Sequence, residues 1–240
     1  RKGGSFDGDD IIEIILEQDV VANFICEKIY KWFVYEIPDE NFVNQMATIL
    51  RNGNYEIKPV MEYLLTSEHF YDINFRGSQI PNPVSQILGL IRKLNLHNME
   101  YPNKYLQRSI GEMGMTLLYP PNVNGWTGHR AWINSITLPM RKRLSSILID
   151  PDTDQRLKFH INIIELANNL SNPNDPRSLV KDFALVLFGL PLSENLENKL
   201  VEILMDGAAE YDWDINASGA NYRLKELVKY MLRLPEAQLA

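Results

Sequence analysis

The chain has 240 residues, a formal net charge of −7 at pH 7 and a single cysteine. An apolar share of 45% and a charged share of 23% are typical of a globular protein and exclude a disordered chain. The acidic balance argues against nucleic acid and anionic membrane surfaces as main partners. The lone Cys26 excludes an intrachain disulfide and a cysteine-based zinc site. No apolar run approaches the roughly 18 residues that a spanning helix needs, so we expect no membrane insertion.

Helical periodicity runs through the chain, and no stretch alternates as a half-buried strand does. Asp39 precedes an apolar stripe that closes at Asn52-Gly53, and Pro83 precedes another, which is typical of helix starts and ends. We predict an all-α protein of about ten helices in an irregular orthogonal or stacked bundle, with one long loop that contains proline, glycine and tryptophan.

The domain prediction is a single helical unit over residues 1–240. Because Arg1 is neither an initiator methionine nor the start of a signal peptide, we expect the carboxyl-terminal part of a longer protein. A turn cluster at 171–176 predicts a possible seam near 150–176, between a helical body (1–149) and a helical repeat (177–240). The repeat is weak: residues 34–50 resemble residues 187–204 and residues 59–70 resemble residues 226–238, so that each copy would be one helix-turn-helix pair.

Metal-binding patterns are poor in this sequence. No two histidines stand four residues apart, the spacing that places two ligands on one helical face. They are His69, His97, His129 and His160. The acidic run Asp150, Asp152 and Asp154 lacks the glycine and glutamate of a calcium loop, so a solvated linker is the better interpretation. We predict no tightly held transition metal and no cofactor.

Nucleophilic motifs are also missing, since the sequence has no G-x-S-x-G, P-loop or dinucleotide fingerprint. Cys26 lies in an amphipathic stretch beside apolar residues, which predicts a buried, inert thiol. Glu112 is a candidate general acid or base, or else an ordinary surface carboxylate. No catalytic residue follows from these patterns, so enzymatic activity stays open.

The segment Tyr119–Arg130 reads YPPNVNGWTGHR and cannot continue a helix. In one interpretation it is a recognition surface, because aromatic rings stack on sugars while amides and guanidinium groups hold hydroxyls or carboxylates. In the other, which we favour, tryptophans plug a gap between helices and asparagines satisfy loop backbone. The candidates for either role are Tyr119, Pro120, Pro121, Asn122, Gly125, Trp126, Gly128, His129, Arg130, Trp132, Asn134 and Arg141.

The stretch from Met113 to Arg143 resembles the signature of a bacterial family, domain of unknown function 1800, whose pattern is PPNV-x-GW followed by WIN and Thr-Leu. The matching residues are Pro120, Pro121, Asn122, Val123, Gly125, Trp126, Gly128, Trp132, Ile133, Asn134, Thr137, Leu138 and Arg141. The closing LRLPEAQLA is similar to the family's ending. The chain departs from the pattern at three places. Met115 stands where the family usually has glutamine, and His129 stands where it has a second glycine. Residues 81–85 replace the family's Lys-Ser-Pro-x-Glu segment.

The resemblance supplies no reaction but implies a setting, since members are commonly large and often exported. It implies a periplasmic or extracellular location, with the amino-terminal half of the same protein, a polysaccharide or another envelope protein as partners. We therefore expect a non-enzymatic helical binding or scaffold module of the cell envelope. The alternative is a glycan-acting hydrolase whose site lies at loop 119–134 and is completed by the amino-terminal half. A cleft at the loop lined by ionisable groups would favour the enzyme, and a buried loop the scaffold.

Overall fold

The computed structural model describes residues 3–96, 103–150 and 161–239. These residues form eleven α-helices and four short 3₁₀ helices and contain no strand, which confirms the predicted all-α class. The chain divides into two compact units, residues 1–79 and 80–240.

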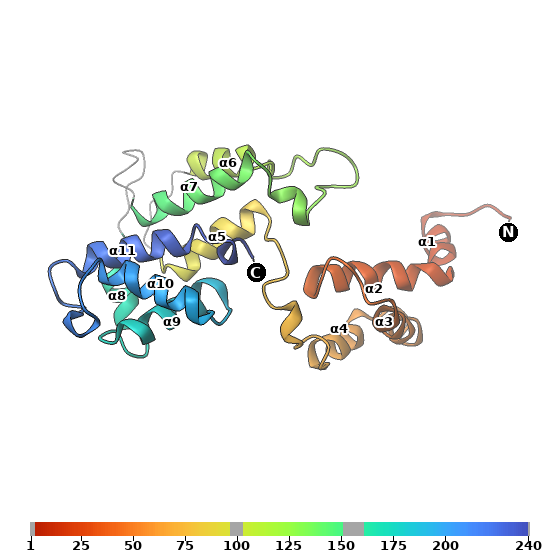
Figure 1. Cartoon of the computed structure of the whole chain (residues 1–240). Helices are drawn as coiled ribbons and strands as arrows, with labels where there is room; N and C mark the ends of the chain where they lie inside the picture. Colours follow the sequence, from red (N-terminus) through yellow and green to blue (C-terminus); the bar gives the residue numbers. More distant parts are fainter. Residues whose placement is uncertain (1–2, 97–102, 151–160, 240) are drawn as a thin grey trace. The chain divides into compact units, whose positions relative to one another are not determined.

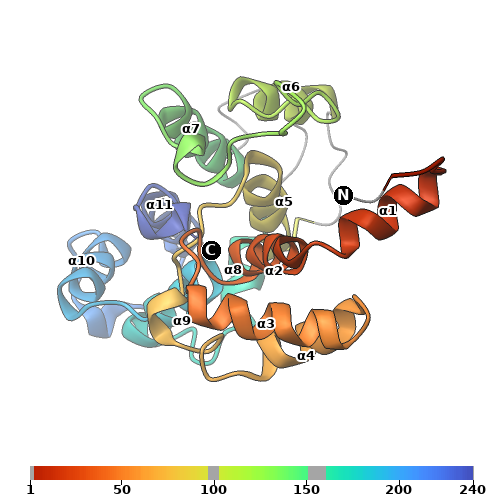
Figure 2. The ribbon, with the colours of Figure 1, turned by 90° about the vertical axis from the view of Figure 1, so that its right-hand side faces the viewer.

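The first unit is built from α1 (Gly8–Leu16), α2 (Asp19–Phe33), α3 (Glu40–Asn52), α4 (Ile57–Thr66) and the 3₁₀ helix η1 (Ile73–Phe75). The helices α2, α3 and α4 lie side by side (Figures 1 and 2). Their apolar stripes meet in one core, which consists of Ala22, Cys26, Tyr30, Val34, Phe42, Val43, Met46, Ala47, Leu50, Val60 and Leu64.

The predicted boundaries of α3 are confirmed by its capping bonds. The Asp39 carboxylate accepts from the backbone N–H of Phe42 at 2.9 Å, and α3 ends at Asn52 with Gly53 as its cap. The predicted buried thiol is also confirmed. Cys26 is fully buried, and desolvation raises its pKa to about 11, so the reactive thiolate is scarce at neutral pH.

The second unit holds the remaining elements: α5 (Pro83–Lys93), α6 (Asn103–Glu112), η2 (His129–Trp132), α7 (Thr137–Ile149), α8 (Ile163–Asn168), α9 (Pro176–Phe188), α10 (Glu194–Met205), η4 (Glu210–Asp212), α11 (Ala220–Met231) and η5 (Glu236–Gln238). One large apolar core joins α5, α6 and α7 to α8, α9, α10 and α11. Pro83 occupies the first turn of α5, as predicted.

The boundary between the units differs from the possible seam suggested near residues 150–176. The observed division falls between residues 79 and 80. Helix α7 before that stretch and α9 after it contribute to the same core, so both belong to one unit. Part of the stretch, residues 151–160, lies outside the described residues.

Candidate binding groove and signature loop

The 119–134 loop lies between α6 and α7 and contains η2, and its first part runs away from these helices (Figure 1). Asn122 organises its first half, since its side-chain oxygen accepts from the Asn124 N–H at 2.9 Å and its carbonyl from Gly125 at 3.1 Å. Gly125 and Gly128 have φ values of 82° and 74°, the left-handed region that a side chain would strain. Both glycines therefore allow the chain to turn where a residue with a side chain would be strained.

The carboxyl end of the loop is fixed by a compact hydrogen-bond network. The Asn134 side-chain oxygen accepts from the N–H groups of Ile136 and Thr137 at 2.8 and 2.9 Å. The Thr137 hydroxyl accepts from the Asn134 N–H and donates to the Trp132 carbonyl at 2.9 Å. These bonds satisfy the backbone where α7 begins. The proposed use of Asn122 and Asn134 to satisfy loop backbone is thus confirmed.

The two tryptophans differ in environment. Trp132 is 8% exposed, so its predicted burial is confirmed, whereas Trp126 is only partly buried. The first part of the loop is open to solvent: Tyr119 is 80% and Val123 103% exposed. The expected buried plug is therefore wrong for most of the loop. It holds at Trp132, which is buried as the last residue of η2.

Arg141, the last of the candidate residues, lies in the core and not on a recognition surface. It is 1% exposed, and its Nη2 donates to the carbonyl of Pro81 at 2.8 Å. Burial lowers its pKa to about 10, which leaves the guanidinium protonated at neutral pH. Of the other candidates, Arg130 is exposed and His129 is partly buried at the start of η2.

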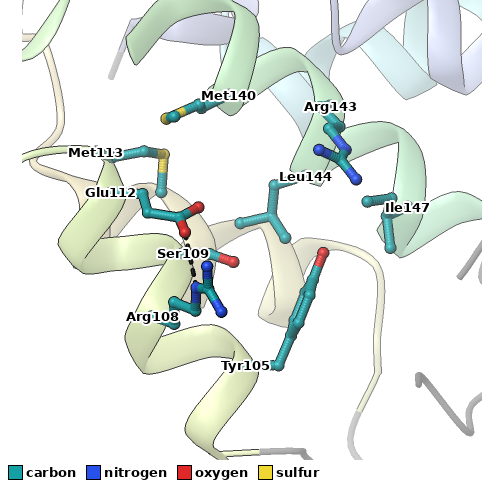
Figure 3. A pocket seen from close by; sticks show the side chains of 9 residues that line it. All are labelled: Tyr105, Arg108, Ser109, Glu112, Met113, Met140, Arg143, Leu144 and Ile147. Carbon is teal, nitrogen blue, oxygen red and sulfur yellow. Dashed lines mark hydrogen bonds and ion pairs between the residues drawn. The ribbon is translucent and has the colours of Figure 1, made fainter. Parts of the chain in front are cut away.

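A groove lies between α6 and α7 (Figure 3). Its volume is about 200 Å³, and its charged members are Arg108 and Glu112 from α6 and Arg143 from α7. Arg108 Nε lies 2.8 Å from Glu112 Oε1, one helical turn away. The remaining lining residues are Tyr105, Ser109, Met113, Met140, Leu144 and Ile147.

A second hollow adjoins this groove and shares Arg143 and Ile147 with it. Lys142, Ser146 and Arg233 complete its lining. Arg233 donates from Nε and Nη2 to the Ser146 hydroxyl at 3.2 and 3.1 Å. These bonds hold the Arg233 guanidinium at the edge of the second hollow. Within the described part of the chain, Lys142, Arg143 and Arg233 form no ion pair. The two hollows thus form one cationic surface, which we call the α6–α7 groove.

Most residues of the α6–α7 groove were not among the sequence candidates. Glu112 was considered, but its ion pair with Arg108 makes it part of a cationic surface rather than an isolated acid. One signal was available in the run Arg141-Lys142-Arg143. The helical period turns Arg141 inward and leaves Arg143 exposed at the groove.

Metal ligands do not gather in the residues that the structure describes. No group of three or more His, Cys, Asp or Glu side chains is placed to hold an ion there. Asp150 instead forms an ion pair with Lys229 at 3.0 Å, while Asp152 and Asp154 lie outside the described residues, as do His97 and His160. Among the described residues, no helix combines the length and the apolar character that crossing a bilayer requires.

Comparison with known proteins connects this architecture to one family. Searches of curated proteins and of solved structures give no match. The family model described as "Protein of unknown function (DUF1800)" matches residues 1–239, nearly the whole chain. The long loop with its buried Trp132, the hydrogen bonds of Asn134 before α7 and the buried Arg141 are the structural counterparts of the sequence signature. The chain therefore belongs to the DUF1800 family.

Proposed function

We propose that this protein is a helical binding module that recognises the acidic groups of a polysaccharide through the α6–α7 groove. One observation carries the proposal. In a chain of net charge −7, this surface gathers four cations, Arg108, Lys142, Arg143 and Arg233, around a single carboxylate that is already paired. Such a local excess of positive charge attracts anionic ligands despite the overall acidity.

The chemistry of the lining favours an acidic sugar over a simple anion. Guanidinium groups bind carboxylates and sulfates through paired hydrogen bonds. Sugar hydroxyls both donate and accept, and the groove offers both kinds of partner in Ser109 and Glu112. Tyr105 adds an aromatic ring at its edge (Figure 3), a surface on which sugar rings stack. Inorganic phosphate, in contrast, would use only the hydrogen-bond donors of the groove.

A binding role is better supported than glycoside hydrolysis. Glycosidases generally place two carboxyl groups on either side of the scissile bond. The 119–134 loop has no Asp or Glu, and the one carboxylate of the groove, Glu112, is ion-paired with Arg108. The groove is thus a cleft with ionisable groups, but its charges suit recognition rather than acid–base chemistry.

The setting is part of the same proposal. An acidic polysaccharide as ligand agrees with the periplasmic or extracellular location implied by the resemblance. The amino-terminal half of the protein and other envelope proteins stay predictions as further partners. The loop and the residue just before it offer a surface for them, because Leu118 and Val123 are almost fully exposed apolar side chains.

Calorimetric titration with oligogalacturonate tests the proposal, with a neutral dextran oligomer of equal length as the control ligand. We expect binding of the uronate alone, weakened by salt. Arg143→Ala should weaken it about tenfold or more, since a charge-assisted hydrogen bond is lost. Arg92→Ala is the matched control, because Arg92 is an exposed arginine on α5. Unchanged affinity in Arg143→Ala would overturn the assignment of the groove.

A further inference from the structure

The strongest unexplained feature of the core is the guanidinium of Arg141. Its Nη2 is bound to the Pro81 carbonyl, but Nε and Nη1 are buried and have no hydrogen-bond partner in the described structure. The side-chain oxygen of Gln86 is buried in the same unsatisfied state. Unpaired buried donors and acceptors are costly and rare in folded proteins, so these two residues call for a common explanation.

Both residues line one small cavity in the second unit. Its volume is about 10 Å³, which is room for one guest of the size of a water molecule. Ser145 contributes a third polar group, since its hydroxyl donates to the Arg141 carbonyl and keeps lone pairs to accept. The rest of the lining is apolar: Ile87, Leu90, Met113, Leu144 and Leu148.

We infer that this cavity is a binding site for one water molecule, which accepts from the Arg141 guanidinium and donates to Gln86 and Ser145. Three such bonds are the usual number for a buried water. A chloride ion would neutralise the buried charge, but it would face two oxygen acceptors and leave the Gln86 oxygen unpaired. The polar lining therefore selects a guest that both accepts and donates.

The water completes a chain of hydrogen bonds through three elements. Gln86 of α5 donates from Nε2 to Gln238 Oε1 at 3.0 Å, and Gln238 donates to the Leu232 carbonyl at 3.3 Å. With the water in place, Arg141 of α7 is linked through Gln86 to the carboxyl-terminal η5. The water thereby joins parts of the unit that lie far apart in sequence, independently of any ligand in the α6–α7 groove.

Two measurements on the full chain test this inference. A high-resolution crystal structure grown in sodium bromide should show one water within hydrogen-bond distance of Arg141 and Gln86, with no anomalous peak. A bromide peak there, or a dry cavity, would overturn the proposal.

A double-mutant cycle supplies the second test. Arg141→Met and Gln86→Leu share no direct bond, yet either one removes a partner of the water. The combined loss in melting temperature should therefore be about 2–4 °C smaller than the sum of the single losses. Additive losses would contradict the bridge. Arg141→Met with Ser193→Ala, which alters the cap of α10, is the additive control. If Arg141→Met does not fold, Ser145→Ala with Gln86→Leu replaces it under the same criteria.

Discussion

The two units contain three consecutive helices with the same pattern of burial. In the first unit these are α2, α3 and α4, and in the second α9, α10 and α11, each packed on the next. When Val34 is matched to Leu187, and one extra residue is allowed in the second copy before Glu194, buried positions coincide along the chain. The matched and buried pairs are Cys26 and Leu179, Tyr30 and Phe183, Val34 and Leu187, Met46 and Leu200, and Leu50 and Leu204.

The two sets of helices differ in what surrounds them. In the second unit, α9 is covered by α5 and η5, and α11 by α7 and α8. In the first unit, α2 leaves Val20, Phe24 and Trp32 exposed. The same local pattern therefore builds the same helix pairs, while the neighbouring elements decide how much apolar surface is removed from water.

The largest predicted effect comes from truncating a matched core position in each unit. Leu50 and Leu204 are both fully buried, so Leu50→Ala and Leu204→Ala should each cost roughly 3–5 kcal/mol of unfolding free energy. Cys26, the single cysteine, lies only in the first core. Thiol labelling in mild denaturant should therefore accelerate in Leu50→Ala.

The control for this experiment is the same labelling in Leu204→Ala, whose second unit should unfold at lower denaturant without a faster reaction of Cys26. Tryptophan fluorescence mainly follows the second unit, where Trp213 is buried, because Trp32 of the first unit is already exposed when folded. Equal acceleration of labelling in both variants would show that the two cores unfold together, and it would contradict their treatment as separate units.

A smaller effect is expected within the signature loop. Trp132→Ala should lower the unfolding free energy by about 3 kcal/mol, because a buried indole is lost and the loop beside it can partly collapse. Trp126→Ala should cost about 1 kcal/mol, since the Trp126 ring is only partly buried. Chemical denaturation measures both. Equal losses would mean that the loop is folded onto the helices along its whole length.

Much of the fold could be predicted because its signals are local. The 3.6-residue apolar period gave the class, and Asp39, Asn52-Gly53 and Pro83 marked boundaries through capping chemistry that involves neighbouring residues alone. The division at residue 79 could not be predicted in this way. It depends on which helices pack together, and the turn cluster at 171–176 looks like a linker although it connects α8 and α9 within one unit.

The groove was harder to predict than the loop, for a physical reason. Asn134 and Thr137 act on adjacent backbone, so their roles are readable from sequence. The cations of the α6–α7 groove stand at positions 108, 142, 143 and 233. They come together only because α6 and the carboxyl-terminal end of α11 pack beside α7. The helical period predicts that the Arg141 side chain points inward. Its hydrogen-bond partner, the carbonyl of Pro81, lies sixty residues away and cannot be predicted from a local pattern.

The helix caps permit a finer comparison of the two units. Asp39 and Ser193 cap α3 and α10 at matched positions, but their bonds to the backbone measure 2.9 and 3.4 Å. Asp39→Ala should therefore cost about 1 kcal/mol and Ser193→Ala about half of that, because the longer bond is weaker and uncharged. Thermal melts of both variants check the order. A larger loss in Ser193→Ala would contradict the geometric argument.

The smallest effects are expected on the outer faces, at one more matched pair. Trp32 of α2 is 72% exposed and Leu185 of α9 is 57% exposed, so neither side chain contributes much buried area. Trp32→Ser and Leu185→Ser should each change the unfolding free energy by less than about 0.5 kcal/mol, as surface substitutions usually do. Denaturant melts at two protein concentrations measure this. A larger loss of unfolding free energy in Trp32→Ser that grows with protein concentration would show that a second copy of the chain covers α2 in solution. The two sets of helices would then differ in exposed apolar surface only in the isolated chain.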